Sequence, residues 1–204
     1  MTYRRRRERE KRSVKYLNSP QFLEECRRLA EQAANPPPSR LARLLSDELP
    51  PDEPTEQTYP LTERQAKLYY AGLPSLPVLV ARTSTTPFKL PSGVDDDENL
   101  KELCPTAGSH PIKEIWGTDT KFSRDLLAYL DEKKVQWTSI DIVRIGPEDQ
   151  WFKPVVIWVG IQPGSLTGRD GREVVLEVQR RLREEGEEFE DVEVEIRESI
   201  VTRW

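Results

Sequence analysis

Proline constrains the first third of this chain more than any other feature of the sequence. Seven of the 17 prolines lie within residues 36–60, including the run Pro36-Pro37-Pro38. Proline has no backbone N–H to donate, and it restricts the residue before it, so regular helices and strands end at these positions. The sequence therefore predicts a proline-broken helical extension over residues 16–76, with an extended linker around residues 50–60.

Short helices are predicted between these prolines. Ser19-Pro20 is typical of a helix start, because serine caps free amides and proline at the first helical position has no N–H to lose; this helix is expected to end at Ala34. A second helix is expected over residues 39–49, and a third from Thr62 to about residue 71, where Thr62 and Gln65 have capping-box spacing. Helices this short are expected to pack on a surface rather than to fold alone.

A denser apolar pattern begins at Pro77. A strand is predicted over residues 77–83, followed by an irregular loop over residues 84–117, which is long for a compact domain. Hydrophobic periodicity then predicts a helix, two strands, a helix and a strand, over residues 119–130, 137–145, 154–161, 170–186 and 192–197. The second of these strands is almost wholly apolar, as in a central position of a sheet.

This order predicts an α+β domain over residues 77–204, with a small antiparallel or mixed sheet and helices on one face. If residues 77–83 supply the first strand, the order is β-α-β-β-α-β, the ferredoxin-like split βαβ pattern. The long first crossover departs from that pattern. For the second long helix, Asp170 is predicted as the capping residue, with Glu173 three residues later, and Gly186 as the end.

The net charge of −5 conceals a division along the chain. Residues 1–15 hold eight basic and two acidic side chains, a net of +6, whereas the other 189 residues hold 23 basic and 34 acidic ones, a net of −11. Clustered guanidinium groups attract phosphate backbones, acidic membrane surfaces or a nuclear-import receptor. The candidate partner-binding or nucleic-acid-binding residues are therefore those of this basic arm: Arg4, Arg5, Arg6, Arg7, Arg9, Lys11 and Arg12. A solvated tail is the alternative interpretation.

The sequence argues against secretion and membrane insertion. No stretch approaches the ~20 apolar residues of a membrane-spanning helix, and no apolar segment follows the Arg-rich N-terminus. Cys26 and Cys104 do not make a disulfide framework in a chain of this size. We therefore expect an intracellular protein, nuclear or cytoplasmic, with both thiols free.

The residues that come nearest to a catalytic pattern lack its spacing. Cys104 and His110 are not held in the geometry of a nucleophilic pair by their spacing, and no CxxC or HxxxH completes a zinc site with them. The glycine-rich segment at residues 160–171 lacks the Walker and dinucleotide motifs, so a turn is expected. The sequence thus predicts no catalytic residue, no metal and no cofactor, and it leaves enzymatic activity open.

Aromatic residues are a further candidate for recognition. Trp116, Trp137, Trp151 and Trp158 lie in or near the predicted α/β domain. Aromatic side chains on a sheet stack bases in RRM-type domains, but the strands here lack the RNP pattern and the body is acidic. Packing in the core or at an interface is the expected role, with base stacking as the alternative.

Five segments carry a family resemblance: LVARTS at residues 79–84, SHPI at 109–112, VQWTSIDIVRIG at 135–146, PGSL at 163–166 and DVEVEIRES at 191–199. Together they resemble a segment, about residues 79–203 here, of a large group of uncharacterised fungal proteins. In many of these the segment precedes a trypsin-like region with a His-containing motif. No protease motif is present in this chain, so no catalytic residue carries over. The resemblance implies a non-catalytic α/β module that is regulatory or binds a partner.

The sequence is compatible with three functions. The first is a non-catalytic protein-binding or regulatory module with a basic N-terminal arm. The second is a nucleic-acid-associated or ribonucleoprotein-associated protein that contacts phosphates through residues 4–15. The third is an enzyme, or a fragment of a trypsin-like protease.

Overall fold

The computed structural model of the chain describes residues 19–34, 40–46, 61–87, 89–91, 99–106 and 109–200. The chain divides into two compact units, residues 1–39 and residues 40–204. In the first unit, α2 (Pro20–Ala34) confirms the predicted helix, and the Ser19 hydroxyl accepts the amide of Phe22 at 3.2 Å. The basic arm, residues 4–12, lies outside the described residues, as do residues 47–60.

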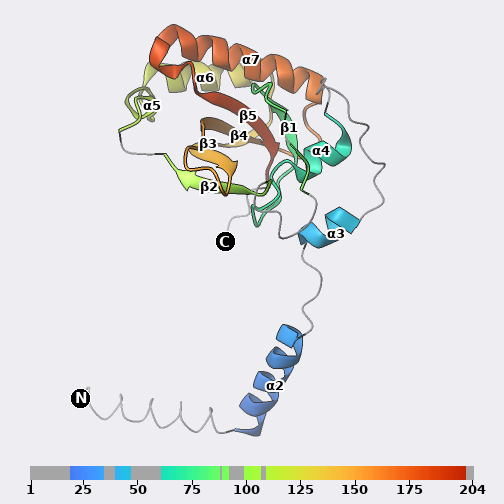
Figure 1. Cartoon of the computed structure of the whole chain (residues 1–204). Helices are drawn as coiled ribbons and strands as arrows, with labels where there is room; N and C mark the ends of the chain where they lie inside the picture. Colours follow the sequence, from blue (N-terminus) through green and yellow to red (C-terminus); the bar gives the residue numbers. More distant parts are fainter. Residues whose placement is uncertain are drawn as a thin grey trace, which may run out of the picture. The chain divides into compact units, whose positions relative to one another are not determined.

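A five-stranded mixed sheet forms the centre of the second unit (Figure 1). The strands, in their order across the sheet, are β1 (Leu79–Arg82), β5 (Glu193–Glu198), β4 (Val155–Ile161), β3 (Trp137–Pro147) and β2 (Lys101–Pro105). β4 and β5 run parallel, and the other neighbouring pairs are antiparallel. The predicted α+β class is confirmed, and β4 is buried along its whole length, as expected for a central strand.

The sheet does not show the ferredoxin-like order. β4 and β5 are direct neighbours, joined by α7 (Gly168–Glu185), and β1 lies outside them at the edge of the sheet. A strand–helix–strand crossover returns the chain parallel to its starting strand, and here it returns to the adjacent position.

The prediction of an irregular loop over residues 84–117 is wrong in part. It contains β2 and the short helix α5 (Ile112–Ile115). β2 has the sequence Lys-Glu-Leu-Cys-Pro, and it lies at the edge of the sheet with no fully buried residue. A mostly exposed edge strand carries no apolar alternation, so the hydrophobic pattern misses it.

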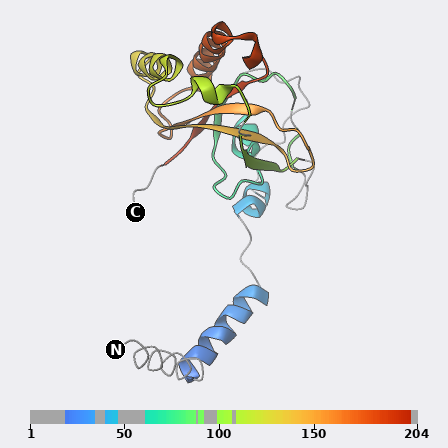
Figure 2. The same ribbon diagram turned by 90° about the vertical axis from the view of Figure 1, so that its left-hand side faces the viewer.

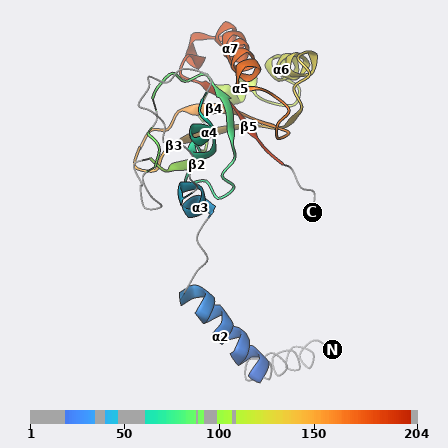
Figure 3. The same cartoon turned by 90° about the vertical axis from the view of Figure 1, so that its right-hand side faces the viewer.

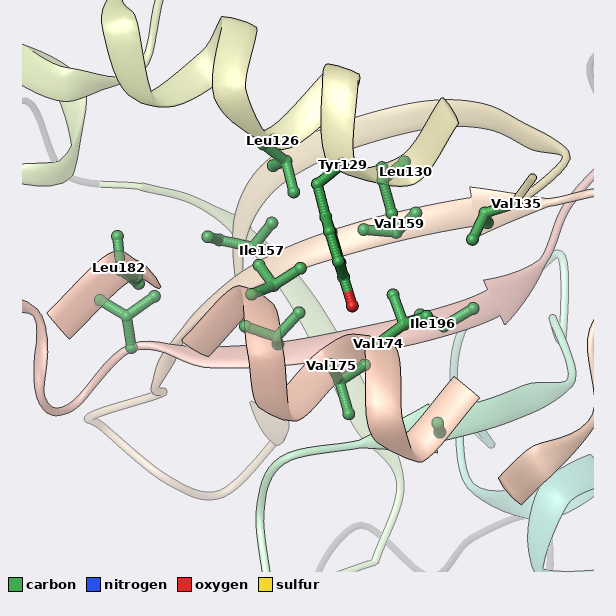
Figure 4. Packing of buried hydrophobic residues seen from close by; sticks show 14 of the residues in the cluster. Leu126, Tyr129, Leu130, Val135, Ile157, Val159, Val174, Val175, Leu182 and Ile196 are labelled. Carbon is green, nitrogen blue, oxygen red and sulfur yellow. The ribbon is translucent and has the colours of Figure 1, made fainter. Parts of the chain in front are cut away.

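Two helices cover one face of the sheet, as predicted. α6 (Lys121–Glu132) and α7 contact each other on this face, where Figure 2 shows them side by side. Figure 4 shows the core between the helices and the sheet. Its labelled residues come from both helices, from the central strands and, for Val135, from the turn between α6 and β3: Leu126, Tyr129, Leu130, Val135, Ile157, Val159, Val174, Val175, Leu182 and Ile196.

The N-cap of α7 is not the residue that the sequence predicts. Asp170 is not the capping residue, because α7 already begins at Gly168 and Thr167 is its N-cap. The Thr167 hydroxyl accepts the amide of Asp170 at 3.2 Å and donates to the carboxylate of Asp170 at 2.8 Å. Gly186 follows the last residue of the helix, as expected.

The opposite face of the sheet is covered by the chain before β1. α4 (Glu63–Leu68) has the predicted capping box between Thr62 and Gln65. Residues 69–73 follow α4 as a turn and pack against the sheet; Figure 3 shows α4 lower in the view than α6 and α7. This second core cluster consists of Tyr69, Tyr70, Leu73, Leu79, Ile145, Val156 and Trp158. The boundary that the sequence predicts after residue 76 lies inside this unit.

Glycine is required in the turn that follows α4. Gly72 has a φ of +98°, and a Cβ there would lie 2.5 Å from the carbonyl oxygen of Lys101. Next to it, the carbonyl of Ala71 accepts the amide of Lys101 at 2.6 Å. The turn is thereby fixed to the start of β2.

Among the described helices, none has the length and apolar content needed to cross a bilayer.

Candidate functional site

The last strand places two charged side chains inside the protein. Val194 and Ile196 of β5 belong to the core beneath the helices, whereas Glu195 and Arg197 alternate with them and point to the other face. That face of an alternating strand is commonly solvated. Here Glu195 is 1% exposed and Arg197 is 8% exposed, because the chain around α4 covers them.

Two tyrosines hold the carboxylate of Glu195. The Tyr69 hydroxyl donates to Oε1 at 2.5 Å and the Tyr70 hydroxyl donates to Oε2 at 2.7 Å. The indole N–H of Trp158 donates to the Tyr70 hydroxyl at 3.0 Å. Burial, and then the charge of Glu195, raise the pKa of both tyrosines well above the ordinary value. Both phenols therefore stay protonated and can donate.

Two cations lie against the same tyrosines. The Arg82 guanidinium donates through Nη1 to the Tyr69 hydroxyl at 3.5 Å and through Nη2 to the carbonyl of Thr86 at 2.8 Å. The ammonium of Lys101 lies over the ring of Tyr69, 3.1 Å from its centroid. Positive charge on an aromatic face is attracted by the ring quadrupole. The cluster thus combines one buried carboxylate with two cations.

The environment of Lys101 makes the charged form of its side chain less stable than it is in water. Desolvation by burial lowers the pKa of Lys101 to about 8; the charge of Arg82 acts in the same direction, and those of Glu195 and Glu193 oppose it. The pKa of the Glu193 carboxyl is raised, mainly by burial and then by Glu195. An amine and a carboxyl group with shifted pKa values in one place are typical of functional sites.

This cluster forms one wall of a cleft of about 490 Å³. Tyr69, Arg82, Lys101, Glu193 and Glu195 all line it. The lining also includes the end of β3 and the turn that follows it, together with Ser84, Thr86, Pro87 and Lys89. The volume lies within the usual range of about 300–1,000 Å³ for small-molecule sites. The cleft can therefore hold a small polar molecule beside Lys101.

Arg197 satisfies its charge elsewhere on this face. Its guanidinium lies 3.5 Å from the ring centroid of Trp158, and Nη2 lies 3.3 Å from the carboxylate of Asp141. It does not line the cleft at Lys101. Arg197 therefore supports the packing of Trp158 rather than the cleft.

A second candidate surface is the turn between β3 and β4, residues 148–152, called here the aromatic turn. Trp151 is fully exposed, and Phe152 is 65% exposed. The turn is held from below by Lys153, which is buried and whose ammonium contacts the carbonyl of Gln150 at 2.9 Å and the carboxylate of Glu102 at 3.1 Å. The aromatic side chains therefore project from an anchored turn.

The residues nearest to a catalytic pattern are not assembled into one. Cys104 lies in β2, and His110 precedes α5, where its Nδ1 accepts the amide of Ile112 at 3.2 Å. Within the described residues, no hydrogen bond joins the two side chains. In the glycine-rich segment, the amide of Gly164 donates to the carboxylate of Glu198 at 2.8 Å, so an acidic side chain already occupies this turn.

The tryptophans have different roles. Trp158 is buried beneath the tyrosines, and Trp116 packs edge-on against Phe122 with 6.5 Å between ring centroids. Trp137 is 37% exposed and donates its indole N–H to Asp131. The expectation of packing is thus confirmed for Trp158 and Trp116, while Trp151 faces solvent.

In the part of the chain that the structure describes, no group of three or more His, Cys, Asp and Glu side chains is placed to hold a metal.

Comparison with known proteins places the chain in no group. No protein-family model, no curated protein and no solved structure matches it.

Proposed function

We propose that the chain is a non-catalytic protein-binding module with a regulatory role, and that the aromatic turn is its main contact with a partner. The observation that carries this proposal is the full exposure of Trp151 beside the exposed Phe152 on an anchored turn. Adjacent large apolar side chains left in solvent are typical of surfaces that become buried on binding.

The turn also indicates the character of the partner. Tryptophan is enriched among the residues that contribute most to protein interfaces, where truncation to alanine costs about 2 kcal/mol or more. Glu148 and Asp149 are exposed next to Trp151 and Phe152. Complementary charge guides association, so the partner should offer an apolar pocket with basic residues at its rim.

A quantitative affinity capture from extracts of the source cells tests this proposal. The wild-type chain is compared with a Trp151→Ala/Phe152→Ala double variant and with Leu176→Ala, which removes an exposed apolar side chain from α7 and serves as the matched control. We expect one partner to be retained by the wild type and the control, and its capture to fall at least tenfold with the double variant. Equal thermal unfolding of the three chains shows that the fold is intact.

Two outcomes would contradict the proposal. If the double variant captures the same proteins in the same amounts, the aromatic turn is not the contact. If the wild type instead adsorbs to zwitterionic phospholipid vesicles and the double variant does not, the exposed aromatics serve a lipid surface.

Contact with nucleic acid through the basic arm is the second proposal. It rests on the division of charge between +6 in residues 1–15 and −11 in the rest of the chain. The acidic body disfavours broad contact with phosphates, which leaves Arg4–Arg12 to make them. Both proposals place the chain inside the cell, where the thiols of Cys26 and Cys104 stay free.

A further inference from the structure

We propose that Lys101 is a covalent binding site for a small aldehyde or α-oxo acid, whose carbonyl carbon forms an imine with Nζ. The site is separate from the aromatic turn and stands without the proposed protein-binding role.

The contacts of Lys101 leave its nitrogen available to a ligand. Nζ lies 3.1 Å from the centroid of the Tyr69 ring and 5.7 Å from that of Tyr70. Among the described residues, no carboxylate lies within ion-pair distance of this ammonium, and no hydrogen bond to it is formed. An aromatic face attracts the positive charge but accepts no strong hydrogen bond. The ring of Tyr69 therefore positions the side chain of Lys101 and leaves its nitrogen without a hydrogen-bond partner in the described part of the chain.

The backbone fixes the position of this lysine. Its amide is bound to the carbonyl of Ala71, and Gly72 lies against its peptide group. Lys101 also pairs with Pro147 in the register of β2 with β3. The backbone of Lys101 is therefore held at the wall of the cleft by both the turn after α4 and the sheet.

The environment makes the amine a better nucleophile than an ordinary lysine. Only a neutral amine has a lone pair that can attack a carbonyl carbon. With a pKa of about 8, roughly a tenth of Lys101 is neutral at pH 7, whereas the neutral fraction of an ordinary lysine is below about one in a thousand. Glu195 does not compete with the ligand for the amine of Lys101, because its two oxygens are bound to Tyr69 and Tyr70.

Glu193 can complete the chemistry as a general acid. It lines the same cleft, and its raised pKa keeps more of the carboxyl protonated than in water. Nζ adds to the carbonyl carbon, and one amine proton moves to the carbonyl oxygen to give a carbinolamine. Glu193 then donates its proton to the hydroxyl group; the C–O bond breaks, and water leaves. The products are a protonated imine on Lys101 and the carboxylate of Glu193, which form a favourable charge pair.

The cleft limits the size and polarity of the ligand. Its volume of about 490 Å³ suits a small molecule rather than a chain segment. Lys89 is exposed and lines the cleft, where it can attract the carboxylate of an α-oxo acid. The ligand class is therefore a small carbonyl compound, with those that carry a carboxylate preferred.

Reductive trapping tests this site on the full chain. Glyoxylate and sodium cyanoborohydride are added at pH 7, and the adduct of each lysine is quantified by peptide mass spectrometry. Lys113, which is exposed on α5, is the internal control within the same wild-type chain. We expect Lys101 to be labelled at least ten times faster than Lys113. Propionaldehyde, which lacks the carboxylate, is expected to label Lys101 more slowly than glyoxylate.

Variants separate the roles of the two residues. Lys101→Arg keeps the positive charge and removes the adduct at this position, while Lys113→Arg leaves labelling of Lys101 unchanged. Glu193→Gln is expected to slow the labelling of Lys101 at least threefold, because it removes the acid. Labelling of Lys101 in the wild-type chain no faster than that of Lys113 would overturn the proposal, whatever the variants do. Unchanged labelling in Glu193→Gln would overturn the role of Glu193.

Discussion

Neutral donors hold the buried carboxylate of Glu195. Both of its oxygens accept phenol hydrogen bonds, and no cation lies within ion-pair distance among the described residues. A buried carboxylate is unfavourable unless its lone pairs are satisfied, and hydrogen bonds to a charged group contribute about 1.5–3 kcal/mol each. Tyr69 and Tyr70 are therefore expected to stabilise the fold through their hydroxyl groups as well as through their rings.

Removal of either hydroxyl should lower stability. Tyr69→Phe and Tyr70→Phe are each expected to reduce the free energy of unfolding by about 1–3 kcal/mol, because each leaves one buried oxygen of Glu195 unsatisfied. Urea denaturation measures this change. Tyr129→Phe is the matched control, because Tyr129 is buried in the core and its hydroxyl forms no hydrogen bond within the described residues. An equal loss in all three variants would show that the network around Glu195 adds nothing.

Lys101 should make stability depend on pH. Its pKa is about 8 in the folded chain, where burial and Arg82 lower it and Glu195 and Glu193 oppose them, and about 10.4 in the unfolded chain. Between these values the unfolded chain binds more protons, so a rise in pH favours the folded state. The stability of the wild type relative to Lys101→Met is therefore expected to rise from pH 8 to pH 9.5.

Urea denaturation at several pH values checks this expectation. Lys113→Met reports the general effect of removing one exposed positive charge. A difference between wild type and Lys101→Met that stays constant from pH 7 to pH 9.5 would show that Lys101 titrates as an ordinary lysine.

Elements with strong local signals could be predicted from the sequence. The capping box of α4 and the wholly apolar β4 are both where the pattern placed them. The cap of α7 was misassigned because Thr167 and Asp170 are both capping residue types, and Asp170 with Glu173 fits the same spacing. Only the contacts of the folded helix distinguish them.

The cleft could not be predicted, because its parts are distant in the sequence. Glu195 reads as the polar position of an alternating strand, and Tyr69 and Tyr70 lie 126 and 125 residues before it. No local pattern links them, and Lys101 belongs to a strand without apolar alternation. The alternating pattern of β5, Glu-Val-Glu-Ile-Arg-Glu, is the same whether its polar face is solvated or covered, so the sequence carries no signal that Glu195 is buried.

Two glycine substitutions test the turn after α4. Gly72→Ala is expected to destabilise the fold by more than about 2 kcal/mol, since it adds a clash with the backbone of Lys101 to the cost of a positive φ. Gly164→Ala is the control: φ there is +69°, but a Cβ meets nothing within 4 Å. Thermal or urea unfolding that gives equal losses for both would contradict the close approach at Lys101.

At the scale of the whole molecule, the division of charge predicts that the basic arm makes the contacts with nucleic acid. A chain that begins at Val14 lacks Arg4–Arg12 and should bind single-stranded RNA or DNA more weakly than the full chain. Each phosphate contact contributes about 0.7–0.9 to the slope of log affinity against log salt concentration. We expect a steep slope for the full chain and a shallow one for the shortened chain, measured by fluorescence anisotropy. Binding that ignores salt, or equal slopes, would contradict a role for the arm.

The pairing of β1 with β5 also has a consequence for the order in which the protein matures. Leu79 pairs with Arg197, and Tyr69 and Tyr70 reach Glu195 only when β5 is present. During synthesis from the N-terminus, Lys101 leaves the ribosome long before residues 193–198 do. Its amine therefore remains an ordinary solvated lysine on the nascent chain. The reactive cleft is formed only with the last strand, so an incomplete chain cannot take up the ligand.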